Sequence, residues 1–113
     1  MLPRLLAAGE QVVDVCHGLH EGRPAVVVLT DRRVLYLRRR RFWGAEVESI
    51  PLSRIRSAED QMGVRLATVA IDAGTGVFEV ADVDRALAQM FCARLRAQLS
   101  AASQERPAAA VNG

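Results

Sequence analysis

The sequence contains no lysine, so all 15 of its basic residues are arginine. It is also poor in aromatic residues, with three Phe, one Trp and one Tyr among 113 residues. Alanine and valine are abundant, so a coding bias toward arginine explains the missing lysine more simply than selection for phosphate recognition. The net charge of +2 is small and aromatic platforms for stacking bases are lacking, so we predict no nucleic-acid partner.

Cysteine is scarce as well, and the two that occur, Cys16 and Cys92, are too far apart for a CxxC or zinc-ribbon motif. We expect two buried free thiols in a reducing compartment. Strand alternation places Cys16 and His17 on opposite faces, so no metal site is predicted. The serines and threonines lack a base–orienter pair, and no glycine-rich phosphate loop is present. We therefore predict no catalytic residue, no cofactor and no enzyme activity.

Long apolar runs are missing too. No stretch approaches the length of a membrane-spanning helix, and the run at residues 5–8 is too short for the core of a signal peptide. We therefore expect a cytoplasmic protein. The length suits one domain with a single hydrophobic core. We divide it into an N-terminal helical segment (1–9), a domain (10–100) and a flexible tail (101–113).

The clearest pattern that is present lies at residues 23–41. Two apolar runs, 25–29 and 34–37, are separated by Thr30-Asp31-Arg32-Arg33, which predicts a hairpin. Asp31 is expected to stabilise the turn by bonding to the backbone two residues further on.

The first of these two strands is apolar on both faces, with Val26 and Val28 on one side and Val27 and Leu29 on the other. A sheet with one face in water should instead alternate. The second face therefore needs a cover. Either the N-terminal helix, through Leu2, Leu5 and Leu6, or a second subunit could supply it, and we favour the helix and a monomer.

The other elements follow from period and turn signals. A first strand is predicted at 11–19, with Val13, Val15 and His17 on one face. An edge strand is predicted at 46–52 and a short strand through Ile55 at 53–60, followed by strands at 64–71 and 77–80. A helix is predicted at 82–100, capped by Asp82. Its apolar stripe, expected to face the core, comprises Val83, Leu87, Met90, Phe91 and Leu95.

This order of elements resembles the pleckstrin-homology (PH)-like fold, specifically the small bacterial PH-like domains. The resemblance rests on Gly9-Glu10 before the first strand, on 28–36 (VLTDRRVLY) and on 49–55 (SIPLSRI). It implies an antiparallel β-sandwich or barrel of about seven strands, capped by one amphipathic helix. It also implies a non-enzymatic binding or scaffold module that acts through protein contacts, with a partner that the sequence does not name.

The candidate binding residues are Arg38, Arg39, Arg40 and Arg41, followed by Trp43. Arginines beside an aromatic residue suit an anionic membrane surface, and this gives an alternative function as a peripheral membrane module. A strand splits the four arginines between two faces. Two arginines acting together, at about 1 kcal/mol each, would strengthen binding to an anionic membrane roughly thirtyfold, which is a weak contact. The competing interpretation is a solvated strand end that keeps the sheet edge from pairing.

Overall fold

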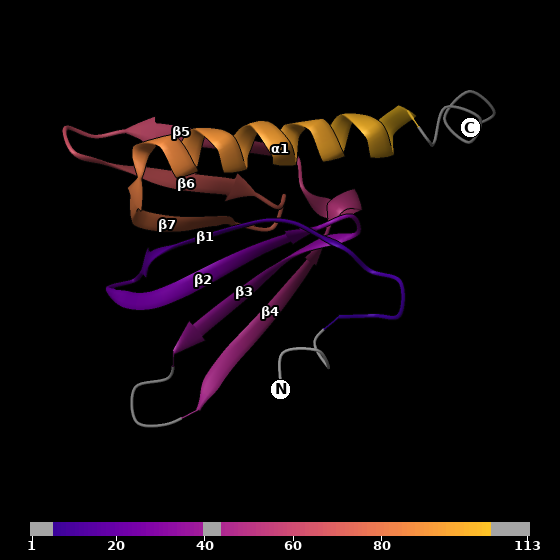
Figure 1. The fold of residues 1–113 in the computed structure, drawn as a ribbon, viewed down its shortest axis with the longest axis horizontal. Coiled ribbons are helices and arrows are strands. Elements are labelled where there is room, and N and C mark those ends of the chain that lie inside the picture. Colours follow the sequence, from indigo (N-terminus) through magenta and orange to yellow (C-terminus); the bar gives the residue numbers. More distant parts are fainter. Residues whose placement is uncertain (1–5, 40–43, 105–113) are drawn as a thin grey trace.

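The computed structural model describes residues 6–39 and 44–104, which form a mainly β fold closed by one C-terminal helix (Figure 1). All strand pairings are antiparallel, and the predicted fold class is confirmed. The elements in chain order are β1 (Val12–His20), β2 (Arg23–Thr30), β3 (Arg33–Arg39), β4 (Ala45–Pro51), the short 3₁₀ helix η2 (Leu52–Arg54), β5 (Ser57–Met62), β6 (Leu66–Asp72), β7 (Val77–Asp84) and α1 (Arg85–Gln104).

The strands form two halves, β1–β4 and β5–β7, which Figure 1 shows as separate layers with α1 beside the second. The sheet order is β4-β3-β2-β1-β7-β6-β5, and the halves join where Leu19 of β1 lies opposite Ala81 of β7. Gly18 makes this junction possible. A side chain there would collide with the Ala81 carbonyl oxygen and press on Val80 and Val83. The missing side chain therefore lets β1 cross close to β7.

The core lies between the inner faces of both halves and is closed by α1. The helix contributes Ala88, Phe91, Cys92 and Leu95, all fully buried. These positions follow the i, i+3, i+4, i+7 spacing of one helix face. The prediction that Phe91 and Leu95 face the core is confirmed.

Two members of the predicted helix stripe are exposed instead: Leu87 at 39% and Met90 at 50%. The predicted cap is wrong as well. Strand β7 continues to Asp84 and passes through Asp82 with a left-handed φ of 57°. The Asp84 carboxylate accepts a hydrogen bond from the Leu87 backbone N–H (3.1 Å) and begins the helix. The helix also runs on to Gln104, past the predicted end at residue 100.

Three local predictions need correction. Residues 6–9 form a turn, and the rest of the predicted N-terminal helix lies outside the described residues. An irregularity in β1 between Val12 and Asp14 turns Val13 toward the core, away from the face of Val15. Ile55 lies between η2 and β5, so no strand passes through it. Within the ranges the structure describes, no helix is long and apolar enough to cross a membrane.

Candidate functional site

The side of β1–β4 that faces away from the core is apolar across neighbouring strands. Strand register places Val15, Val28, Leu35 and Ser49 in one row, and His17, Val26, Leu37 and Val47 in the next. Neighbouring side chains in such rows lie about 5 Å apart and form a continuous surface. We call this surface the outer apolar face; its apolar members are Val12, Val15, Val26, Val28, Leu35, Leu37 and Val47.

A groove of about 450 Å³ runs over the outer apolar face, lined by Leu6 together with six of its members. Several of the valines remain open to solvent, including Val12 (49% exposed), Val15 (44%) and Val26 (37%). The expectation that β2 is apolar on both faces is confirmed, because Val27 and Leu29 are fully buried on the other side. Contiguous exposed apolar surfaces are typical of sites that bind proteins, membranes or ligands.

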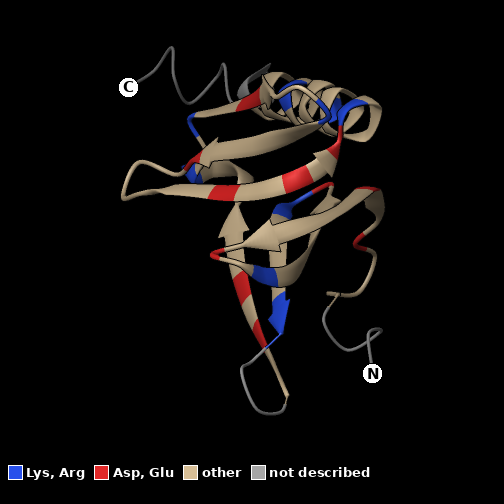
Figure 2. Cartoon of the chain, turned by 90° about the vertical axis from the view of Figure 1, so that its left-hand side faces the viewer, with Lys and Arg blue, Asp and Glu red and all other residues tan. Residues whose placement is uncertain are grey.

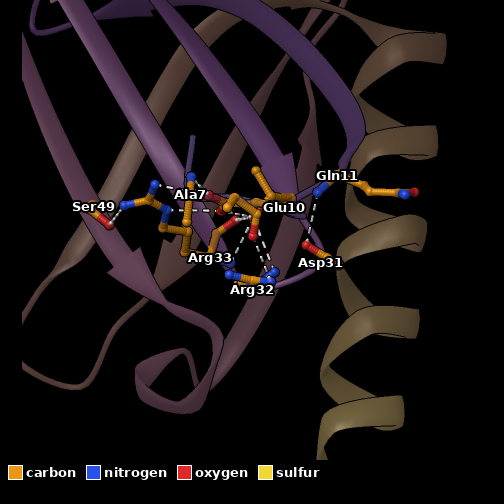
Figure 3. Close-up of polar contacts among 9 residues, drawn as sticks. Ala7, Glu10, Gln11, Asp31, Arg32, Arg33 and Ser49 are labelled. Carbon is orange, nitrogen blue, oxygen red and sulfur yellow. Dashed lines mark hydrogen bonds and ion pairs between the residues drawn. The ribbon is translucent and has the colours of Figure 1, made fainter. Parts of the chain in front are cut away.

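Close in sequence to Leu6, the carboxylate of Glu10 is buried and lies at the centre of a set of polar contacts (Figure 3). Arg33 donates to it through Nε and Nη2, both at 2.9 Å. The Thr30 hydroxyl donates at 2.6 Å and the Ala7 backbone N–H at 2.8 Å. This two-pronged ion pair fastens the turn before β1 to the β2–β3 hairpin. We call these contacts the Glu10 clamp.

The hydrogen bond from Arg33 lowers the pKa of the Glu10 carboxyl from 4.5 to about 2, although burial alone would raise it. The bonds from Thr30 and Ala7 lower it further. Glu10 therefore stays ionised, and the clamp stays closed, throughout the neutral pH range. Glu10 was part of the family pattern in the sequence, but nothing local indicated its pairing with Arg33.

The turn between β2 and β3 is held by Thr30. Its hydroxyl accepts hydrogen bonds from the backbone N–H groups of Arg32 (3.1 Å) and Arg33 (3.0 Å). Asp31, which was predicted to bond within this turn, instead accepts from the Gln11 backbone N–H at 3.1 Å (Figure 3). The turn is thereby tied to the start of β1, and the prediction for Asp31 is wrong in its partner.

Arg38 and Arg39, the described members of the arginine cluster, lie on opposite faces of β3. Arg38 donates to Glu21 at 3.0 Å and to Glu46 at 2.8 Å, and its side chain is 27% exposed. These bonds raise the pKa of its guanidinium, chiefly through Glu46. Arg39 is exposed at the end of the strand. In Figure 2 this basic end of β3 lies beside the acidic residues of β4. Arg40, Arg41 and Trp43 lie outside the described residues.

A smaller hollow of about 150 Å³ lies beside Tyr36, His20 and Phe78, with Arg38 and Glu48 also at its wall. The Tyr36 ring contacts both of the other rings, at centroid distances of 6.0 and 5.1 Å. His20 Nδ1 lies 2.8 Å from the Glu79 carbonyl oxygen, which assigns the proton to that nitrogen. Burial raises the pKa of the Tyr36 hydroxyl, so this group stays protonated.

Both cysteines are buried and unpaired, as predicted. Burial raises the pKa of the Cys16 thiol to about 12 and that of the Cys92 thiol to about 11. A protonated buried thiol is a poor nucleophile and a poor metal ligand. Among the described residues, no three His, Cys, Asp or Glu side chains gather closely enough to hold a metal ion.

Seven antiparallel strands in two layers, closed by a single C-terminal helix, define a PH-like domain. A family model described as "Bacterial PH domain" matches residues 6–96. The chain therefore belongs to the bacterial PH domain family, whose PH-like fold is typically a binding module. No curated protein and no solved structure matches the chain.

Proposed function

We propose that this bacterial PH domain is a non-enzymatic binding module that acts through protein contacts made by its outer apolar face. The observation that carries the proposal is the second apolar side of β1–β4. Four strands present aliphatic side chains outward, and the core on the other side is already closed by α1. Burying this surface against a partner would release the water that now covers it.

The face also indicates the chemistry of the partner. At the outward positions of β1–β4, the Arg, Asp and Glu side chains that the structure describes are Arg33, which is paired with Glu10, and Arg39 at the opposite end. The partner that fits is an apolar protein segment with aliphatic side chains and an acidic residue near the end that meets Arg39. Aliphatic contacts supply the affinity, and the acidic residue fixes the direction of binding.

Affinity capture from the cells that make the protein tests this proposal, with a matched pair of variants. Val26→Ser/Val47→Ser places hydroxyl groups on the outer apolar face. Val64→Ser makes the same change at a valine that is 95% exposed near the start of β6. We expect the double variant to lose at least nine-tenths of a specific partner that the wild type and Val64→Ser both retain. Equal capture by all three proteins would contradict the proposal.

The membrane alternative is tested in parallel with anionic vesicles at low and high salt. Arg38 is engaged with two carboxylates, which weakens this alternative because its charge is already balanced. Arg39→Gln/Arg41→Gln is the informative variant. Binding that the wild type shows at low salt and that this variant loses about tenfold would favour the peripheral membrane function instead.

A further inference from the structure

The first described residue of the chain already lies in the groove of the outer apolar face. Leu6 lines the groove together with Val26, Val28 and Leu37. Leu5 precedes Leu6 in the sequence. It is the last residue of the segment 1–5, Met-Leu-Pro-Arg-Leu, which lies outside the described part of the chain. The groove is therefore lined by the residue that follows this largely apolar segment directly.

The Glu10 clamp fixes where this chain end enters. The Ala7 N–H donates to the Glu10 carboxylate, and the Glu10 N–H donates to the Ala7 carbonyl oxygen at 3.0 Å. Arg32 Nη2 donates to the Ala8 carbonyl oxygen at 3.3 Å. These contacts hold the turn 7–10 against the β2–β3 hairpin. Leu6 is thereby kept at the groove, whatever the residues before it do.

The remaining length is sufficient to cross the face. Five residues span up to roughly 17 Å when extended. Four neighbouring strands are about 14 Å wide between the first and the last. Leu2 and Leu5 can therefore reach the same surface as Leu6, and a tether this short gives them a high effective concentration there.

We infer that residues 1–5 are an internal occupant of the outer apolar face, with Leu2 and Leu5 beside Leu6, and that a protein partner binds by displacing them. The inference rests on the proposed function and adds its regulation. The lining of the groove is aliphatic throughout, which suits the side chains of Leu2 and Leu5. A partner must compete with this segment, so its apparent affinity is reduced by the fraction of molecules in which the face is covered.

Methyl NMR on the full chain tests the inference directly. We expect nuclear Overhauser contacts between the methyl groups of Leu5 and those of Val28 or Leu37. Leu2→Ser/Leu5→Ser should remove them, shift the methyl signals of the outer apolar face and raise the fluorescence of an added apolar dye at least threefold. Arg4→Ser, in the same segment, should change neither. Absence of the contacts, or a double variant that matches the wild type in both measurements, would overturn the inference.

Two further readouts separate this inference from the proposed function. If the segment competes with a partner, Leu2→Ser/Leu5→Ser should capture that partner about fivefold better than the wild type. Capture that is unchanged in this variant, yet lost in Val26→Ser/Val47→Ser, would overturn the internal occupant and leave the protein-contact function standing. An intact chain that sediments as a dimer, with methyl contacts between subunits across this face, would also overturn it by making a second copy the occupant.

Discussion

The two halves of the sheet differ in the polarity of the residues on their outward sides. In β5–β7 the outward rows are mostly polar, with Glu59 and Glu79 on either side of Ala70, and Gln61 opposite Thr68. In β1–β4 the corresponding rows carry Val15, Val28, Leu35, Val26, Leu37 and Val47. Alternation is the usual pattern for a sheet with one wetted face. The second half follows this pattern, and the first half departs from it without any folding requirement, since both halves already share one inner core.

The apolar residues of the strands therefore fall into two groups, one buried in the core and one exposed on the outer side. Val69 and Val80 are fully buried and stabilise the fold. Val26 and Val47 are exposed on the outer side and take no part in the shared core. Stability measurements should therefore respond to the inner set, and association measurements to the outer set.

The largest effect is expected in the core that the halves share. Phe91→Ala removes a fully buried ring and should lower the free energy of unfolding by about 3–5 kcal/mol. Leu87→Ala, at a position that is 39% exposed on the same helix, should cost less than about 1 kcal/mol. Chemical denaturation of both variants measures the two costs. Similar losses would mean that the helix face is assigned wrongly.

An intermediate effect is expected at the Glu10 clamp, which belongs to the first half alone. Glu10→Gln keeps the shape but removes the charge that Arg33 meets, and should cost about 2–3 kcal/mol at pH 7. The pKa of Glu10 is about 2 in the folded chain, below its ordinary value of 4.5. The clamp therefore contributes fully above about pH 4.5 and is lost as the pH falls toward 2.

Denaturation at several pH values checks this sign. The wild type should lose its advantage over Glu10→Gln progressively between pH 4.5 and pH 2. A difference between the two proteins that stays constant across this range would show that the carboxylate is not the source of the stability.

The smallest effect on stability should come from the outward sides themselves. Val26→Thr in the first half and Val77→Thr in the second should each change the free energy of unfolding by less than about 1 kcal/mol. With Leu2→Ser/Leu5→Ser as the background, Val26→Thr should lower apolar-dye fluorescence about twofold. Val77→Thr should leave it unchanged, because its row contains Ser57 and Asp72. Equal responses would remove the distinction between the two outward sides.

Much of this architecture could be predicted from sequence, because the information is local. The β2–β3 hairpin, the edge position of β4 and the two-sided apolar character of β2 all follow from short runs and turn residues. Which side of α1 faces the core could not be predicted in this way. Small residues such as Ala88 and Cys92 face inward where the helix packs closely, and the larger Leu87 and Met90 point outward. A stripe chosen by side-chain size therefore finds Phe91 and Leu95 but misses these small inward residues.

The Glu10 clamp was also beyond local reasoning, because Glu10 and Arg33 are separated by 23 positions and meet only after the hairpin has formed. The ion pairs of Arg38 were beyond local reasoning for a related reason. The partners of Arg38, Glu21 and Glu46, come from other parts of the chain. A run of like charges in a sequence does not show which of its members are neutralised in the fold.

The two buried thiols have a consequence for measuring how often this domain opens. Cysteine alkylation proceeds through the thiolate, and with pKa values of about 12 and 11 the folded chain holds almost none. The rate of cysteine alkylation therefore reports how often the folded chain opens and exposes a thiol. Cys16 lies on β1 and Cys92 on α1. Because both thiols belong to the core that α1 closes, modification of either one would report opening of that core. With only two cysteines in the chain, the rate of alkylation therefore measures how often this one core opens.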